Sequence, residues 1–210
     1  MNMGFYSERV FPRVLNRVMD TKQSRQVRAR VCASLDGEVL EIGFGTGLNL
    51  PHLPSAVTVL RAVDPLKNGR ALAGERLKSS PVPVEFVGLD GQAIPLEDES
   101  VDAALSTWTL CSIPDPVAAV REIRRVLRPG GTMFFVEHGR SPDSGVLKWQ
   151  RRLNPLQRRI ACGCTLDSDI TGVIEDGGLR VDHVDTYYMK GEPKVFGWTF
   201  EGSARRPIEE

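Results

Sequence analysis

Three glycines at alternate positions follow an apolar segment, and their spacing could serve ligand binding. Residues 39–42 predict a buried parallel strand, and Gly43, Gly45 and Gly47 come directly after it. Because glycine has no Cβ, the chain can turn sharply and a ligand can approach the main chain closely. Amides at the start of the next helix would offer donors and partial positive charge to a carboxylate or phosphate. The pattern predicts a nucleotide-type cofactor site; the alternative is a turn that only packs strand on helix.

The residues around this turn narrow the type of cofactor. Glu41 brings a negative charge close to the turn, and this pairing suits a zwitterionic amino-acid group better than a pyrophosphate. A dinucleotide fingerprint requires a third glycine, or an alanine, where this chain has Leu48. This residue disfavours an NAD-dependent oxidoreductase. The G-x-G-x-G spacing instead predicts S-adenosylmethionine as the cofactor.

Two aspartates follow later predicted strands. The strand 57–63 ends at Asp64, about 20 residues past the glycines, where a carboxylate can accept hydrogen bonds from both ribose hydroxyls. Its alternative role is a helix N-cap. Asp90 follows the strand 84–87 and could accept the adenine amino group, while the amide of Gly91 or of the next residue donates to a ring nitrogen. Its alternative role is that of an ordinary turn aspartate.

Candidate residues for the reaction itself follow the fourth and fifth strands. Thr107 and Trp108 stand at the end of the fourth strand, where the loop should face the cofactor. The fifth strand, 132–136, is followed by Glu137 and His138. His138 is the best-placed general base, and its alternative role is that of a capped strand end. Four further candidates stand behind it: His52, Asp167, Tyr187 and Tyr188.

Strands and helices alternate along the chain and predict an α/β fold with a Rossmann-like, doubly wound, mostly parallel sheet of seven strands. Helices are expected within 5–35, over 68–77 and over 116–127. The segments 179–189 and 195–200 predict a C-terminal antiparallel hairpin.

Residues 1–210 are predicted to form one domain. Its parts are N-terminal helices or a lid (1–36), a cofactor-binding core (37–140), substrate-side helices with the hairpin (141–202) and a loose tail (203–210).

The N-terminal helices raise two separate expectations. The first carries an apolar stripe that includes Val10, Val14 and Val18, which we expect in the core rather than in a lid, although residues 5 and 6 could cover a ligand. The second should run over 24–34, and its arginines, Arg25, Arg28 and Arg30, are expected on a solvated surface.

Composition and charge exclude several classes of function. Lys plus Arg equals Asp plus Glu, at 27 each, so a global basic field for nucleic-acid binding is absent. No apolar run reaches membrane-spanning length and no secretory pattern is present, which predicts a cytoplasmic protein without stable membrane insertion. The cluster Cys162-Gly163-Cys164 offers too few ligands for a closed zinc site, so no metal is expected and local packing is preferred. The sequence does not indicate an oligomeric state.

The chain resembles the class I S-adenosylmethionine-dependent methyltransferases, in the branch of quinone-biosynthesis methyltransferases and mammalian methyltransferase-like thiol methyltransferases. The resemblance covers residues 39–139 and runs through EIGFGTG, AVDP, LDGQAIPL, STWTLCSIPDP, REIRRVLRPGG and FFVEHG. It implies that the methionine end is held by Glu41, Gly43, Gly45 and Gly47, the ribose by Asp64, the adenine by Asp90 and its neighbours, and that Thr107 and Trp108 line the methyl-donor site. The mammalian relatives have an apolar N-terminal anchor that this sequence lacks, so their location at lipid is not transferred.

The resemblance further implies direct methyl transfer to a small-molecule acceptor. A partly apolar thiol is favoured and a phenol or quinol is the runner-up, with Trp108, Leu110, Trp149 and Tyr187 as candidate lining. A catalytically silent partner subunit that only binds the cofactor is the alternative from another class. Because a sulfonium is already an activated donor, alignment of the reactants supplies much of the advantage and a strong base is not compulsory.

Overall fold

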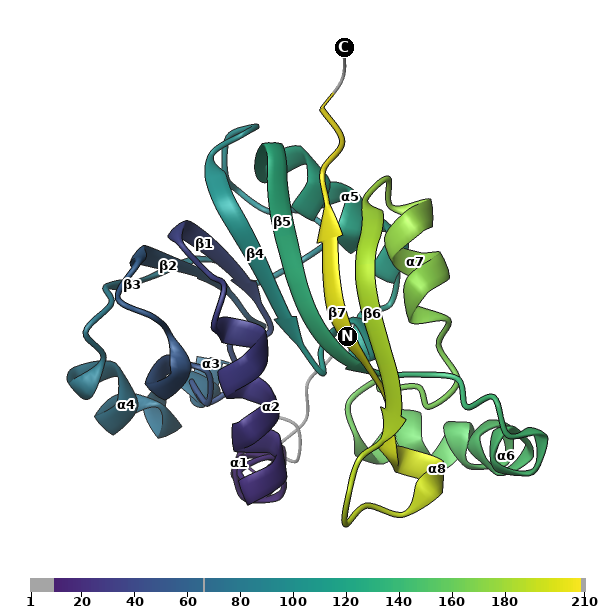
Figure 1. Cartoon of the computed structure of the whole chain (residues 1–210). Coiled ribbons are helices and arrows are strands. Elements are labelled where there is room, and N and C mark those ends of the chain that lie inside the picture. Colours follow the sequence, from purple (N-terminus) through teal and green to yellow (C-terminus); the bar gives the residue numbers. More distant parts are fainter. Residues whose placement is uncertain (1–9, 66, 209–210) are drawn as a thin grey trace.

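A seven-stranded sheet forms the centre of the computed structural model, which describes residues 10–65 and 67–208 (Figure 1). The strand order is β3-β2-β1-β4-β5-β7-β6, and β7 is antiparallel to both of its neighbours while the other pairs are parallel. This is the predicted doubly wound sheet with its C-terminal hairpin. The strands are β1 (Gly37–Ile42), β2 (Val57–Val63), β3 (Val84–Gly88), β4 (Val101–Thr107), β5 (Leu127–His138), β6 (Arg180–Tyr188) and β7 (Trp198–Arg205).

Helices cover both faces of this sheet, so successive residues of the central strands are buried on opposite sides. Val39 packs in the cluster that contains Val27 of α2, while Leu40 packs with Ile123 of α5, and all but Val27 are at most 1% exposed. This explains why apolar residues occupy consecutive positions of β1, at Val39 and Leu40, instead of alternating with polar ones. The helices are α1 (Phe11–Val18), α2 (Lys22–Cys32), α3 (Lys67–Leu72), α4 (Gly74–Ser79), α5 (Pro116–Val126), α6 (Ser144–Ile160), α7 (Ile170–Asp176) and α8 (Lys194–Gly197), with short 3₁₀ turns at Leu50–His52 and Leu110–Ser112.

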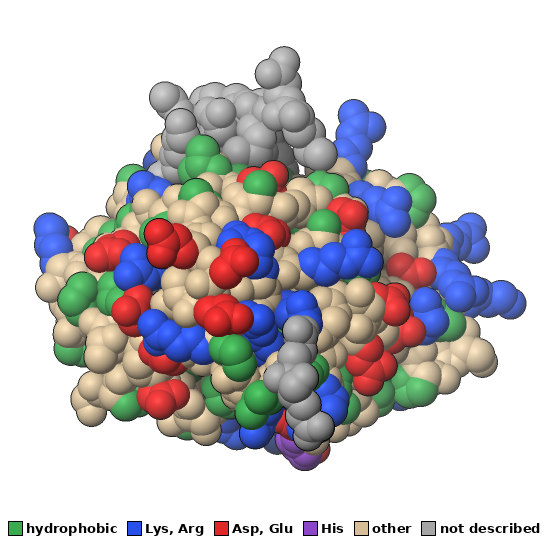
Figure 2. Space-filling view, turned by 90° about the horizontal axis from the view of Figure 1, so that it is seen from above, with side chains coloured by type: hydrophobic (Ala, Val, Ile, Leu, Met, Phe, Trp, Pro, Cys, Tyr) green, Lys and Arg blue, Asp and Glu red, His purple; other side chains and the backbone are tan. Residues whose placement is uncertain are grey.

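The chain reverses its winding direction between β1 and β4, which are neighbours in the sheet but far apart in sequence. Ligands of open α/β sheets bind outside the carboxyl ends of the strands at such a point. Helices α1, α6 and α8 lie at this end of the sheet, in the lower part of Figure 1. The opposite end carries interspersed acidic and basic side chains (Figure 2).

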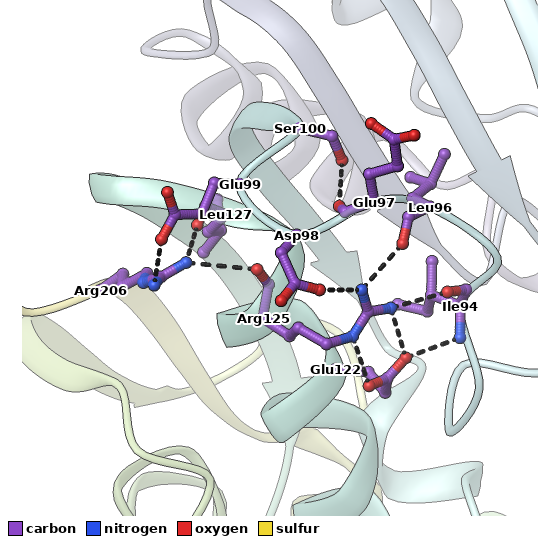
Figure 3. Close-up of polar contacts among 10 residues, drawn as sticks. All are labelled: Ile94, Leu96, Glu97, Asp98, Glu99, Ser100, Glu122, Arg125, Leu127 and Arg206. Carbon is purple, nitrogen blue, oxygen red and sulfur yellow. Dashed lines mark hydrogen bonds and ion pairs between the residues drawn. The ribbon is translucent and has the colours of Figure 1, made fainter.

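An arginine network fixes the loop that joins β3 to β4 (Figure 3). Arg125 of α5 donates to the carbonyls of Ile94 and Leu96, both at 2.8 Å, and pairs with Glu122 and Asp98. Two residues of the acidic segment that follows, Asp98 and Glu99, are held by ion pairs with Arg125 and Arg206. The network anchors the loop that begins with the predicted adenine-binding residues.

Two expectations about the elements differ from the structure. The helix expected over 68–77 is divided into α3 and α4. Ser203–Arg205, expected in the loose tail, belong to β7, because this strand lies between β5 and β6 and its backbone is hydrogen-bonded on both sides. In the described part of the chain, no helix has the length and apolar character needed to cross a membrane.

The apolar stripe of α1 is also not core. Val14 and Val18 are 48% and 62% exposed, because α1 lies at the carboxyl end of the sheet instead of on one of its faces. Asn16 of this helix accepts a hydrogen bond from the Thr46 hydroxyl at 2.8 Å, which places α1 against the glycine turn. Residues 5 and 6, considered as a cover for a ligand, lie outside the described residues.

Candidate functional site

The glycine turn adopts the backbone that its sequence predicts. Gly43, Gly45 and Gly47 have φ angles of +79°, +56° and +73°, which a residue with a Cβ adopts only with strain. The Gly45 amide donates to the carboxylate of Asp64 at 2.6 Å, across the ends of β1 and β2. Asp64 therefore supports the turn directly, a contact between residues 19 positions apart that was not foreseen.

Gly43 and Gly45 differ in the space available around their backbone. A Cβ on Gly43 would lie 2.0 Å from the hydroxyl of Thr109, so this position is closed by protein atoms. Within the described residues, a Cβ on Gly45 would meet only the Gly43 carbonyl, at 3.9 Å. Gly45 thus presents an open main-chain surface, which fits a ligand that lies against the backbone.

A buried polar chain extends from the end of β1 to α2. The Asn49 amide donates to Glu41 at 2.6 Å and to the Thr107 hydroxyl at 3.0 Å, and Arg28 donates to Asn49 at 2.6 Å and to Thr107 at 2.9 Å. Glu41 and Asn49 are each 1% exposed. Burial raises the pKa of Glu41 to about 8, against the opposing effect of the Asn49 hydrogen bond.

Arg28 corrects the prediction of a solvated arginine face. It is only 5% exposed, because this side of α2 packs on the sheet, whereas Arg25 and Arg30 are exposed. The sequence treats the three arginines alike, since one helix face cannot be assigned to the core from charge alone. The structure adds Arg28 and Asn49 to the candidate site.

Trp108 and His138 lie next to this chain. The guanidinium carbon of Arg28 is 4.8 Å from the centre of the Trp108 ring, and the Trp108 and His138 rings are 6.1 Å apart. Trp108 has a φ of +52°, a strained backbone conformation for a bulky residue. Burial lowers the pKa of His138 to about 4, so the imidazole is neutral at pH 7.

Unpartnered polar atoms cluster in the same place. Among the described residues, Arg28 Nε, Glu41 Oε2, Trp108 Nε1 and His138 Nδ1 are buried without a hydrogen-bond partner. Buried polar groups are ordinarily paired, and each exception requires an explanation. Their position at the carboxyl ends of β1, β4 and β5 indicates a ligand-binding site.

The predicted adenine-binding residues lie at the edge of this region. Asp90 is exposed, and one of its carboxylate oxygens accepts the amide of Gln92 at 2.9 Å, as in a turn aspartate. Gly91 packs near Ile42, since a Cβ there would lie 3.3 Å from the side chain of that residue. The segment therefore reaches the end of β1, and Asp90 remains open to solvent.

The reserve candidates for a base have other partners. The phenol of Tyr187 donates to Glu201, that of Tyr188 shares a 2.7 Å hydrogen bond with Ser141, and Asp167 accepts from Asn154 at 2.6 Å. Burial lowers the pKa of His52.

Two expected lining residues lie elsewhere. Leu110 is a core residue at 1% exposure, and Trp149 is 57% exposed beside a hollow of about 490 Å³ between α6 and α8. Cys164 faces Cys111, with the two sulfurs 3.4 Å apart and reduced.

Glu137 gives a testable pH dependence. Its carboxylate accepts from Ser106 at 2.6 Å, yet burial raises its pKa from 4.5 to about 7. The folded state therefore binds this proton more tightly than the unfolded state, so the stability associated with it is present below pH 4.5 and lost as pH rises through 7.

Replacing this carboxyl group should flatten the pH dependence. In the wild type, the free energy of unfolding should fall by on the order of 3 kcal/mol over this range because of Glu137, and we expect Glu137→Gln to lack this fall. Thermal melting between pH 5 and pH 8 measures it, and the exposed Glu75→Gln is the control. Parallel melting curves for wild type and Glu137→Gln would contradict the assignment.

Comparisons with known proteins agree with this geometry. Residues 40–135 match the family described as a methyltransferase domain. The human thiol S-methyltransferase TMT1B is 34% identical over 199 residues, which cover 87% of this chain and 75% of the relative. Its rat counterpart is 33% identical over 164 residues, covering 76% of this chain and 65% of the relative, so this chain spans slightly less than two thirds of that protein.

Two further similarities extend the comparison. The demethylmenaquinone methyltransferase of Roseiflexus castenholzii is 32% identical over 176 residues, which cover 73% of this chain and 71% of the relative. A solved SAM-dependent methyltransferase from Methanosarcina mazei superposes with a TM-score of 0.66 at 21% identity, over 83% of this chain and 94% of its own. The solved structure, at 21% identity, supports the fold alone. The relatives above 30% identity support membership of the family.

Proposed function

Because this chain belongs to the S-adenosylmethionine-dependent methyltransferase family, we propose that it methylates a small, partly apolar thiol. The observation that carries the proposal is the cluster of unpartnered buried polar atoms beside the open backbone of Gly45. The relatives named as thiol S-methyltransferases support the choice of acceptor. The balanced charge of the chain supports a small-molecule partner rather than nucleic acid. Residues 1–210 would act as one methyltransferase domain, and a cytoplasmic location stays a prediction.

The residues at the carboxyl ends of the strands fit the parts of the cofactor. The glycine turn and Glu41 would hold its methionine end, and Asp64 its ribose. The adenine would lie against Asp90 and Gly91. Thr107 and Trp108 would line the end that carries the methyl group. When bound, the cofactor supplies a methyl group that its sulfonium has already activated.

The protein then has to bind the acceptor, exclude water and accept at most one proton. A thiol with a reference pKa near 8.5 is a few per cent thiolate at neutral pH, so orientation supplies much of the rate. His138 would accept the proton, since its imidazole is neutral at pH 7; the burial that lowers its pKa to about 4 also makes it a weaker base than free imidazole, so its assistance to a thiol would be modest. A phenol, with a pKa near 10, would depend more strongly on this base.

An acceptor panel tests the proposal. Purified protein with S-adenosylmethionine should release S-adenosylhomocysteine when given alkyl or aryl thiols, and less readily when given matched phenols. Turnover of a phenol or quinol without turnover of any thiol would favour the chemistry of the demethylmenaquinone relatives. Cofactor binding without turnover of any acceptor would favour the silent partner subunit.

Removing the imidazole should separate the two acceptor classes. We expect His138→Ala to slow a phenolic acceptor by a factor of about 10² or more, and a thiol by less, because general-base catalysis contributes that much when it is needed. Raising the pH should restore the rate of the variant by ionising the acceptor in solution. The exposed His183→Ala is the control. Equal losses for thiol and phenol, unchanged at high pH, would assign His138 to the structure alone.

A further inference from the structure

Helix α6 packs on the protein with polar side chains and exposes apolar ones. Gln150 and Asn154 are 1% and 8% exposed, and both form hydrogen bonds to the segments that precede and follow the helix. Trp149 and Leu156 are each 57% exposed. A surface helix of a globular protein ordinarily turns its apolar face toward the core, so this reversed arrangement indicates that the apolar face has another partner.

The exposed apolar residues of α6 form a continuous stripe. Five apolar residues, spaced by three or four positions, share one face of the helix: Val146, Trp149, Leu153, Leu156 and Ile160. At 1.5 Å per residue, this stripe is about 21 Å long. Three of its residues also line the hollow of about 490 Å³ beside α8, together with Pro193 and Val195, so the apolar surface extends beyond α6.

Basic side chains border this stripe. The charged residues of α6 are all basic, namely Lys148, Arg151, Arg152, Arg158 and Arg159, although the whole chain has 27 residues of each sign. Lys148, Arg152 and Arg159 are spaced so that they follow one side of the stripe. Within the described residues these three form no ion pair, whereas Arg151 lies 3.8 Å from Asp167. The face therefore combines apolar area with uncompensated positive charge.

The charge of α6 indicates which partner can cover the stripe. In a twofold contact between two copies of this chain, the same face would meet itself, and the two basic borders would repel each other. A partner with negative charge beside an apolar layer would match both parts of the face.

The position of α6 in the fold also favours an extended partner. Helices α1 and α8 lie at the same end of the sheet as α6 (Figure 1), and Val14, Val18 and Phe196 on these helices are 48%, 62% and 37% exposed. Exposed apolar residues at this end therefore belong to three separate helices. This arrangement suits a broad surface better than a single bound peptide.

We propose that α6 binds the surface of a lipid bilayer that contains anionic phospholipids. An interfacial helix of this composition lies in the plane of the membrane, with its apolar face about 5–10 Å deep in the headgroup region. Trp149 and Leu156 would enter that region, while Lys148 and Arg159 would stay at the level of the anionic headgroups. The inference goes beyond the proposed function and requires no membrane-spanning helix. It would turn the carboxyl end of the sheet toward the bilayer, into which a partly apolar acceptor partitions.

Cosedimentation with lipid vesicles tests the proposal without cofactor or acceptor. We expect the full chain to bind vesicles made of equal parts phosphatidylglycerol and phosphatidylcholine, and to bind pure phosphatidylcholine vesicles at least tenfold more weakly. The double variants Trp149→Ala/Leu156→Ala and Lys148→Gln/Arg159→Gln should each reduce binding to the anionic vesicles at least tenfold. Because these side chains are exposed, both variants should melt near the wild-type temperature.

Matched controls remove exposed side chains elsewhere on the molecule. Ile208→Ala removes an apolar side chain that is 71% exposed, and Lys78→Gln/Arg180→Gln removes two exposed basic ones. Both controls should bind the anionic vesicles within about threefold of the wild type. An equal loss of binding in the controls and in the α6 variants would overturn the proposal, since a general effect of charge or apolar area would then explain the binding.

Lipids that carry bromine on their acyl chains locate the contact, because bromine quenches tryptophan fluorescence at short range. The wild type should be quenched, and Trp149→Phe should bind the vesicles but lose most of the quenching. Quenching that persists in Trp149→Phe would overturn the role of α6.

Three further results would overturn the proposal: no binding to anionic vesicles, equal binding to both kinds of vesicle, or undiminished binding by the α6 variants. Self-association that Trp149→Ala/Leu156→Ala abolishes, without vesicle binding, would assign the stripe to a second copy of the chain. The proposed function is tested separately by the release of S-adenosylhomocysteine, so it can stand if vesicle binding fails.

Discussion

Gly45→Ala should reduce the affinity for S-adenosylhomocysteine by more than tenfold and leave the protein folded. The added methyl group would project from the turn into the space where we place the cofactor, and no atom of residues 10–65 or 67–208 would lie nearer to it than 3.9 Å. The backbone strain at a φ of +56° should cost about 1–2 kcal/mol of stability. Calorimetry measures the affinity, and thermal melting measures the stability.

Gly191→Ala is a matched control for this strain. Gly191 also has a positive φ, +88°, and no atom in the described part of the chain would lie within 4 Å of its Cβ, but it is in the turn between β6 and α8. Gly43→Ala should show the reverse pattern, with a large loss of stability, because its Cβ would collide with Thr109. Normal binding by Gly45→Ala would mean that the glycine turn serves only to pack strand against helix.

Asp64→Ala should have a comparably large effect, for two reasons. The carboxylate supports the Gly45 amide at 2.6 Å, and the proposal gives it the ribose hydroxyls as well. Hydrogen bonds to a charged group contribute about 1.5–3 kcal/mol each, so the affinity for S-adenosylhomocysteine should fall tenfold to several hundredfold. Asp64→Asn, which retains one acceptor, should lie between the alanine variant and the wild type.

A ribose analogue separates the two roles of Asp64. The wild type should discriminate against 2′-deoxy-S-adenosylhomocysteine, and Asp64→Ala should lose most of this discrimination. Asp185→Ala, which removes an exposed carboxylate from β6, is the control. If Asp64→Ala weakens both ligands by the same factor and discrimination persists, Asp64 acts only by supporting the turn.

Local sequence determined much of the fold. The second strand was predicted over 57–63 and is observed as Val57–Val63, because its apolar residues fit a strand buried on both faces. The glycine turn was equally predictable, since few residues other than glycine adopt the backbone angles it requires. The order of strands and helices then placed Asp64, Thr107 and His138 at one end of a parallel sheet.

Only the tertiary structure decided which polar side chains became buried there. Arg28 belongs to a helix with several arginines, and nothing in its local sequence distinguishes it from Arg25; its burial depends on how α2 packs on the sheet. Val14 shows the converse, an apolar residue left 48% exposed because α1 extends past the sheet. The periodicity of apolar and polar residues along a helix indicates which residues share a face. The element that covers this face belongs to a distant part of the chain, so the local sequence does not identify it. For this reason the sequence predicted the cofactor, while the structure was needed to show that Arg28 and Asn49 are buried beside Glu41.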